Sequence, residues 1–281
     1  MRIIRRVADM ARWSENERRQ GRRIAFVPTM GFLHDGHLSL VRDAKKRGDR
    51  VVVSIFVNPT QFAAGEDFAG YPRDFSRDSG LLAAENVDVL FHPAPEEMYP
   101  EACQTRVDVE TLGKPLCGML RPGHFQGVAT VVTKLFNAVR PHVAIFGEKD
   151  YQQLQLIRRL VRDLMYDIEI VGHPIVRESD GVAMSSRNAY LTAKERRAAA
   201  CLSRSLRKAQ ALVRRGEVSA RTIIDTVGAD LRSEPLATVE YVKVADLETL
   251  EDLEQISGAA LLAIAVRIGK ARLIDNQVLA R

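Results

Sequence analysis

The chain has 281 residues, of which 46% are hydrophobic and 27% are charged. This composition is typical of a globular protein, and no apolar run approaches the roughly 20 residues that span a bilayer. The net charge of +5 would suit nucleic acid, but no basic motif interleaved with aromatic residues accompanies it. We therefore expect small anionic substrates, with no nucleic-acid or membrane partner.

The first 23 residues contain eight arginines but lack the apolar core of a secretory signal. Acidic residues interrupt the positive charge, and residues 6–20 have the apolar spacing of an amphipathic helix. The three cysteines, Cys103, Cys117 and Cys201, are too widely spaced for a disulfide framework or a CxxC metal site. We expect a cytoplasmic protein.

Strands and helices alternate along the first 176 residues. Short apolar runs rich in β-branched residues predict strands at 24–27, 51–57, 87–91, 142–146 and 168–171. Amphipathic or apolar helical patterns predict helices at 38–46, 74–85, 128–139 and 151–163. This alternation predicts an α/β fold with a Rossmann-like parallel sheet.

The pattern changes after residue 176. Residues 177–191 are polar and read as a loop. They precede two predicted helices, at 194–215 and 219–231, and three predicted short strands, at 239–244, 260–266 and 271–274. We therefore expect two domains, a Rossmann-like domain over residues 1–176 and a smaller α+β domain over residues 177–281.

Polar clusters follow three of the predicted strands. His34-Asp35-Gly36-His37 follows the first strand, Asn58 and Gln61 follow the second, and Gly147-Glu148-Lys149-Asp150 follows the fourth. Ligands of parallel α/β sheets bind beyond the carboxyl ends of the strands. We therefore expect the three clusters to line one pocket.

The histidine cluster has the setting of a phosphate site. The first N–H groups and the dipole of a helix favour anions, and a glycine in the turn before it lets backbone approach a phosphate. His34 and His37 can donate hydrogen bonds to phosphate oxygens and stabilise charge that develops during transfer. A metal pair or a simple helix cap are the alternatives, but the other four histidines lack ligand spacing.

Three further features fit a nucleotide. Lys149 can neutralise phosphate, and Asp150 can bind ribose hydroxyls or magnesium. The loop at 184–188 offers hydroxyls and a guanidinium for a triphosphate, unless it is only a solvated linker. The turn from Arg121 to His124 either binds an anion or caps a helix, with His124 satisfied by a backbone group. The sequence contains neither a Walker A motif nor GxGxxG after the first strand, which excludes the common P-loop and dinucleotide-binding classes.

These motifs resemble those of the pantoate–β-alanine ligase family, within the HxGH nucleotidyltransferase superfamily. The resemblance covers nearly the whole chain and rests on residues 28–31, 34–37, 56–62, 121–128, 146–153 and 184–188. It implies an ATP-dependent condensation of (R)-pantoate with β-alanine to pantothenate, through a pantoyl adenylate, with release of AMP and pyrophosphate. It also implies Mg²⁺ with ATP, a homodimer formed by the N-terminal domain, and a C-terminal lid over the ATP site.

The resemblance also implies roles for individual residues. His37, His34 and Lys149 would be catalytic. The residues implied to bind ATP are Met30, Gly31, Phe32, Leu33, His34, Asp35, Gly36, His37, Gly147, Glu148, Lys149, Asp150, Val176, Met184, Ser185, Ser186 and Arg187. Asn58, Gln61, Arg121 and Gln153 would bind the other substrates. No protein ligand for Mg²⁺ is implied beyond the neighbourhood of Asp150.

Two other functions remain open at this stage. Another member of the superfamily would transfer a nucleotidyl group to a different acceptor and leave AMP on its product. An RNA-binding protein would use the positive charge and would bind polynucleotide with a strong dependence on salt. The three clusters argue against RNA, because they are expected to converge on one pocket rather than to follow a groove.

Overall fold

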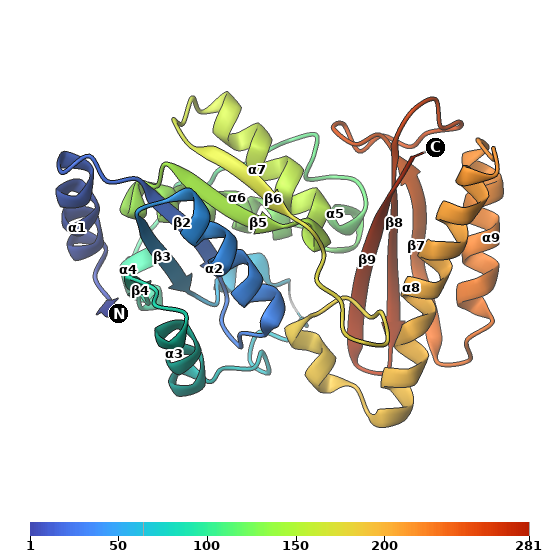
Figure 1. The fold of residues 1–281 in the computed structure, drawn as a ribbon, viewed down its shortest axis with the longest axis horizontal. Coiled ribbons are helices and arrows are strands. Elements are labelled where there is room, and N and C mark those ends of the chain that lie inside the picture. Colours follow the sequence, from blue (N-terminus) through green and yellow to red (C-terminus); the bar gives the residue numbers. More distant parts are fainter. Residues whose placement is uncertain (64, 281) are drawn as a thin grey trace. The chain divides into compact units, whose positions relative to one another are not determined.

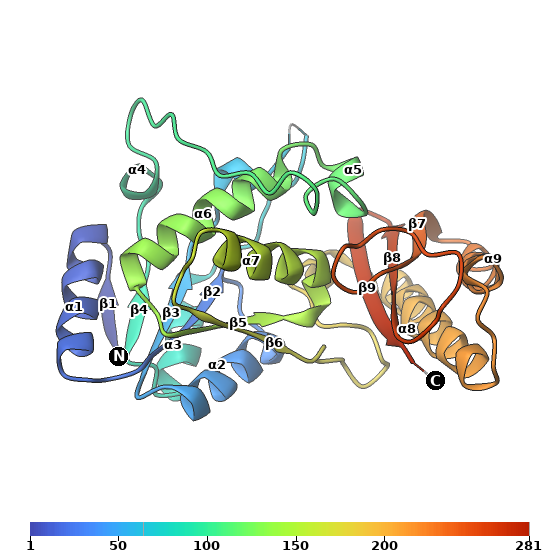
Figure 2. The ribbon, with the colours of Figure 1, turned by 90° about the horizontal axis from the view of Figure 1, so that it is seen from above.

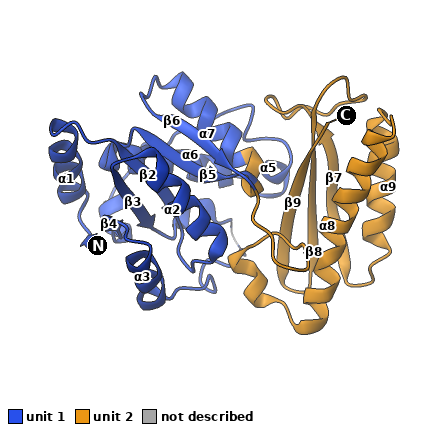
Figure 3. Cartoon of the chain, in the orientation of Figure 1, with its two compact units in different colours: residues 1–148, 153–174 blue, residues 149–152, 175–281 orange. Residues whose placement is uncertain are grey.

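The computed structural model (Figure 1) describes residues 1–63 and 65–280. It divides into two compact units (Figure 3), one made of residues 1–148 and 153–174 and the other of residues 149–152 and those from 175 onward. Each unit has its own hydrophobic core. No helix in the described part of the chain combines the length and the apolar character needed to cross a membrane.

A parallel sheet forms the centre of the first unit. Its six strands, counted over the described residues, are β1 (Arg2–Ile4), β2 (Ile24–Thr29), β3 (Arg50–Ile55), β4 (Val89–Phe91), β5 (Val143–Gly147) and β6 (Glu169–His173). They lie in the order β1-β4-β3-β2-β5-β6, and every pairing is parallel. The predicted Rossmann-like α/β fold is confirmed. Strand β1 was not predicted, since it is only three residues long and begins with an arginine.

Helices cover both faces of this sheet. Those of the described first unit are α1 (Val7–Arg19), α2 (Asp35–Arg47), α3 (Phe75–Ala84), α4 (Pro95–Met98), α5 (Cys117–Leu120), α6 (His124–Val139) and, apart from its first two residues, α7 (Tyr151–Asp163). Figure 2 shows α6 and α7 on one side of the sheet and α2 and α3 on the other. Val41 of α2 and Leu82 of α3 share a core with Val27 and Val53. On the opposite face, Phe26 and Phe136 meet edge to face, with ring centroids 6.4 Å apart.

An antiparallel sheet forms the second unit. Its strands, over the described residues, are β7 (Ala237–Ala245), β8 (Ala260–Ile268) and β9 (Ala271–Leu279), in that order. Its α-helices are α8 (Ala193–Arg214) and α9 (Ala220–Arg232). They share a buried core with the sheet that includes Leu206, Ile223 and Ile264. The expected α+β architecture of this region is confirmed.

Local capping explains where several helices begin. Asp74 precedes α3 and its side chain accepts a hydrogen bond from the backbone N–H of Arg77 at 3.0 Å. Thr192 and Glu195 form a reciprocal capping box at the start of α8. Such caps satisfy backbone N–H groups that have no partner inside the helix.

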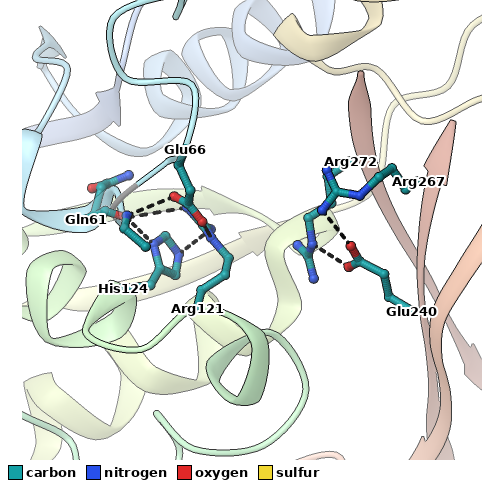
Figure 4. Close-up of polar contacts among 8 residues, drawn as sticks. Gln61, Glu66, Arg121, His124, Glu240, Arg267 and Arg272 are labelled. Carbon is teal, nitrogen blue, oxygen red and sulfur yellow. Dashed lines mark hydrogen bonds and ion pairs between the residues drawn. The ribbon is translucent and has the colours of Figure 1, made fainter. Parts of the chain in front are cut away.

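A bulge in β7 redirects one acidic side chain. The pairing with β8 shifts between Val239 and Tyr241, and Glu240 lies at this irregularity. Its carboxylate accepts hydrogen bonds from Arg267 of β8 at 3.0 Å and from Arg272 of β9 at 2.7 Å (Figure 4). The bulge thus ties all three strands together through one carboxylate.

Candidate active site

The first unit brings two of the predicted clusters, and the beginning of the third, to one edge of its sheet. Strands β3, β2 and β5 are neighbours and parallel, so their carboxyl ends meet at the same edge. The histidine turn follows β2, the 3₁₀ turn Pro59–Gln61 follows β3, and Glu148 follows β5. The side-chain amide of Gln61 donates to the sulfur of Met30 at 3.1 Å, which joins the first two clusters directly.

His34 and His37 lie against each other at the start of α2. His34 is the N-cap residue, in extended conformation, and the two ring centroids are 4.0 Å apart. The backbone N–H of His34 donates to Nδ1 of His37 at 3.3 Å. A neutral His37 ring must then carry its proton on Nε2, which makes Nε2 a donor. Both side chains are only half-buried, so the pair can meet a ligand.

The turn before these histidines differs from the sequence expectation. Phe32 and Leu33 donate their backbone N–H groups to the buried carboxylate of Asp78, at 2.6 and 2.8 Å. The prediction that the first N–H groups of the helix bind phosphate is not affected, but the prediction that Phe32 and Leu33 bind ATP did not foresee that their N–H groups already have an acceptor. The acceptor is the carboxylate of Asp78, because α3 places this side chain next to the turn.

Asn58 lies behind Gln61. It is 1% exposed, and its Oδ1 accepts from the hydroxyls of Tyr99 at 2.8 Å and Thr60 at 3.0 Å. Its Nδ2 donates to Oε1 of Gln61 and to the backbone oxygen of Gly127, both at 3.1 Å. The amide of Asn58, predicted to bind substrate, is thus hydrogen-bonded within the protein, where it orients Gln61.

Arg121 is also hydrogen-bonded within the protein (Figure 4). Its guanidinium donates to both oxygens of Glu66, at 2.5 and 2.7 Å, and to Nε2 of His124 at 3.0 Å. Nδ1 of His124 then donates to the backbone oxygen of Gln61 at 2.7 Å. The sequence left two interpretations of the Arg121–His124 turn, an anion site or a helix cap with His124 bonded to a backbone group. The structure shows the hydrogen bond of the second interpretation. The network holds Gln61 from its backbone side.

The charge of Arg121 decides the protonation of Glu66. Burial by itself would raise the pKa of the Glu66 carboxyl, but hydrogen bonds and charge from Arg121 outweigh it, and the pKa lies below its ordinary value. Glu66 is therefore ionised at neutral pH, and the ion pair with Arg121 persists there.

The second unit holds the other nucleotide-site candidates. Lys149 lies 3.8 Å from Asp150, and the side-chain amide of Asn276 donates to the backbone oxygen of Lys149 at 3.0 Å. Lys149 is the middle residue of a 3₁₀ turn, Glu148–Asp150, which directly follows β5. Asn276 of β9 thus contacts the backbone of Lys149 directly within this unit.

A second contact of β9 lies next to the loop at 184–188. The buried carboxylate of Asp275 accepts two hydrogen bonds from Arg177, at 2.7 and 3.0 Å. Next to Arg177 in the chain, the backbone oxygen of Val176 accepts a hydrogen bond from the N–H of Met184 at 2.9 Å. This bond joins the two ends of the segment 176–184. Ser185 then accepts from the N–H of Arg187 at 3.3 Å and begins the 3₁₀ helix Ser186–Tyr190.

Sequence reasoning missed the acidic supports of the site. Asp78 lies one helical turn before Leu82, and these are the two buried residues of α3. An acidic residue on the apolar stripe of a helix must have a buried partner, and this was the signal available. Asp275 had a similar signal, because it interrupts an apolar strand pattern.

Asp150 is the residue near which the sequence predicted Mg²⁺. Among the described residues, no group of three or more histidine, cysteine or carboxylate side chains could hold a metal ion. The side chain of Asp150 is 49% exposed and has Lys149 beside it. Asp150 would therefore supply at most one carboxylate to a Mg²⁺ held mainly by the phosphates of a nucleotide, which is the usual way in which Mg²⁺ is bound in nucleotide sites.

Comparison with known proteins identifies the family. A family model described as pantoate-beta-alanine ligase matches residues 2–278. The chain belongs to this family. Pantothenate synthetases of Heliobacterium modesticaldum and Geobacter sulfurreducens are 55% and 56% identical to it, over 99% of this chain and of each relative.

Solved structures of the same family have the same fold. The pantothenate synthetase of Thermus thermophilus has a TM-score of 0.95 at 45% identity, with all of both chains covered. The pantoate–β-alanine ligase of Francisella tularensis, solved in complex with β-γ ATP and β-alanine, has a TM-score of 0.82 at 34% identity, with 99% of this chain and 97% of that chain covered. As a member of the pantoate–β-alanine ligase family, the protein is an enzyme of the ligase class.

Proposed function

We propose that the protein condenses (R)-pantoate with β-alanine to form pantothenate, through a pantoyl adenylate. A pantoate carboxylate oxygen attacks the α-phosphorus of ATP, and the bond to pyrophosphate breaks with its electron pair leaving on pyrophosphate. The β-alanine amine then attacks the acyl carbon, AMP leaves with the electron pair of the C–O bond, and the nitrogen loses a proton. A carboxylate is a poor electrophile, and the mixed anhydride supplies the good leaving group that it lacks.

The single observation that carries this proposal is the family match over residues 2–278. The placement of the His34 and Gln61 clusters on neighbouring strand ends supports it, because carboxylate and α-phosphate must meet in one place. The Francisella relative, by its description, binds ATP and β-alanine in a fold that covers 99% of this chain.

We propose the following roles in adenylate formation. His37, through its Nε2–H, donates to an α-phosphate oxygen together with His34, and Lys149 adds positive charge. Gln61 and Gln153 bind pantoate. The nucleotide is bound by residues 30–37, 147–150 and 184–187 and by Val176.

Asn58 and Arg121 enter the proposal as supports rather than as ligands. Asn58 orients the side chain of Gln61, and Arg121 acts on its backbone through His124. Both act by keeping the pantoate-binding amide in one position, which lowers the entropic cost of binding.

We propose that Mg²⁺ arrives as part of the ATP complex, where it neutralises phosphate charge. Asp150 would supply at most one ligand to this ion, because it belongs to no ligand cluster among the described residues.

The remaining expectations stay proposals that rest on the family resemblance. We propose a cytoplasmic homodimer formed through the N-terminal domain. We also propose that the C-terminal domain acts as a lid, since an acyl adenylate must be protected from water.

Isotope exchange between labelled pyrophosphate and ATP tests the function. The purified protein is incubated with Mg-ATP and labelled pyrophosphate, with and without pantoate and in the absence of β-alanine. We expect exchange only with pantoate, and release of AMP and pantothenate when β-alanine is added. Folded protein that shows no exchange, or that exchanges without pantoate, would contradict the proposal. A product that retains AMP would indicate a nucleotidyltransferase instead.

A further inference from the structure

The turn between β2 and α2 has an unusual backbone. Gly31 has a φ of +82° and Phe32 a φ of +50°, so two successive residues lie in the left-handed region. Glycine adopts this conformation readily, but a residue with a side chain does so at a cost in free energy. Something in the surrounding structure must therefore hold Phe32 in place.

Asp78 provides the constraint. Its Oδ2 accepts from the N–H of Phe32 at 2.6 Å, and its Oδ1 accepts from the N–H of Leu33 at 2.8 Å. The carboxylate is 1% exposed, so water does not compete for these bonds. Two short bonds to successive N–H groups determine the orientation of both peptide planes.

The charged residues around Asp78 do not supply a better explanation of its burial. The nearest guanidinium is that of Arg77, with a nitrogen 3.5 Å from Oδ1, and it also lies over the ring of Phe32. Burial raises the pKa of Asp78 even though the two backbone N–H groups and Arg77 act to lower it. The ionised carboxylate is therefore costly to bury at this position, and the two backbone N–H groups of the turn are the contacts that offset this cost.

The constraint reaches the histidine pair within one residue. Leu33 is followed by His34, whose N–H donates to Nδ1 of His37. That bond selects the ring tautomer with the proton on Nε2. A change in the peptide plane at Leu33 would turn the N–H of His34 away from His37.

We propose that Asp78 is a positioning residue for the adenylation step, which holds the turn Gly31–Leu33 so that His34 and His37 keep their orientation and His37 its tautomer. This inference rests on the proposed function for its effect on catalysis, but the effect on the His37 tautomer does not depend on it. Asp78 touches no substrate in this account and acts through the two N–H groups alone.

The substitution Asp78→Asn tests the proposal. The asparagine oxygen can accept from one N–H group, but its NH₂ group faces the other, so the turn loses one bond. We expect kcat of pyrophosphate exchange to fall by about tenfold to a hundredfold, as expected for a small displacement of catalytic groups, with little change in KM for pantoate. The melting temperature should fall by only a few degrees, because a single buried N–H group is left without an acceptor.

Asp88→Asn is the matched control. Asp88 also accepts from a backbone N–H, that of Val51 at 2.8 Å, and also has an arginine nitrogen at 3.5 Å. It lies before the amino end of β4, away from the histidines. We expect this variant to keep its exchange activity.

Nitrogen NMR of the His37 ring gives a readout that does not need activity. At a pH where the ring is neutral, we expect one tautomer with Nε2 protonated in the wild type and in Asp88→Asn, and a mixture of tautomers in Asp78→Asn. If the wild type shows no exchange at all, the proposed function fails. The NMR comparison of the His37 tautomer in wild type and Asp78→Asn would still show whether Asp78 positions the histidines.

Three results would overturn the proposal. One is a folded Asp78→Asn variant with kcat within twofold of the wild type. Another is a reduced kcat with an unchanged His37 tautomer, which would mean that Asp78 acts by another route. If Asp78→Asn does not fold, Asp78→Glu keeps the charge and moves the carboxylate by one methylene, and reduced kcat with mixed tautomers is then expected. In that case, the third contrary result is an Asp78→Glu variant that either has full activity or does not fold.

Discussion

At the scale of single residues, the two nitrogens of His37 have separate tasks. Nδ1 accepts from the backbone N–H of His34, and we assign Nε2 to the phosphate. Asparagine can replace the first nitrogen and glutamine the second, because their amide groups lie at matching distances along the side chain. The pair of variants therefore separates the structural task from the catalytic one.

We predict that His37→Asn folds normally but loses about a hundredfold or more in the rate of adenylate formation, since it lacks a donor at Nε2. His37→Gln should lose less, because its NH₂ can still donate. Single-turnover measurement of AMP formation, with thermal unfolding as the control, checks both. Equal activity of His37→Asn and wild type would show that the ring only caps the helix.

Glu66 predicts a pH dependence of stability. Its pKa is lowered from the ordinary value of 4.5, so its ionised form stabilises the fold above that pH. This stabilisation is lost as the pH falls through the lowered pKa of the folded protein. We predict that wild type exceeds Glu66→Gln in melting temperature at pH 7 and that the difference shrinks below about pH 4.5. A difference that stays constant down to pH 3 would contradict the assignment.

At the scale of elements, Gly127 sets how closely α6 approaches the turn after β3. A Cβ at this position would lie 2.4 Å from the backbone oxygen of Thr60, a distance that no real contact tolerates. Gly80 in α3 has nothing within 4 Å of such an atom. The two helical glycines therefore predict opposite effects of the same substitution.

We predict that Gly127→Ala destabilises the protein by about 1–3 kcal/mol through overpacking and raises KM for pantoate, because the helix pushes on the turn that carries Gln61. Gly80→Ala should stabilise by about 0.5–1 kcal/mol, as alanine favours the helix. Urea unfolding of the two variants measures both values. A Gly127→Ala variant as stable as the wild type would mean that α6 moves without cost.

The elements also show where pattern reasoning succeeds. The apolar, β-branched run in β3 and the helical pattern of α7 predicted both elements within two residues at each end. Strand β3 is buried on both faces, and α7 has one buried face and one exposed face, so each matches its own pattern. Helix α6 was predicted to begin at Val128 but begins at His124. Its cap is Gly123, in the left-handed conformation, and this local conformation leaves no apolar signature in the sequence.

At the scale of the whole molecule, each unit has a separate core, and a cysteine reports on the second one. Cys201 of α8 is 1% exposed, and burial raises its pKa to about 11. At pH 8 about one thiol in a thousand is then ionised. Reaction with a thiol reagent therefore requires the core of this unit to open.

We predict that Asp275→Ala accelerates labelling of Cys201 by about tenfold or more, because Arg177 loses a buried partner worth about 1–3 kcal/mol. Asp225→Ala is the control, since its ion pair with Arg221 is exposed on the surface of α9 and contributes little. Mass spectrometry after timed labelling at pH 8 follows Cys201 directly. Similar rates in the two variants would show that the Asp275 contact does not stabilise this core.

The sequence by itself determined the α/β architecture, the family and the chemical groups available at the strand ends. These properties depend on periodicity and on residues close together in the chain. Only the tertiary structure decided which groups face a ligand and which support them. Asp78 lies 46 residues from Phe32, and Arg121 lies 55 residues from Glu66. Hydrogen bonds between residues so far apart in the sequence form only when the whole chain has folded, so the local sequence pattern does not predict them.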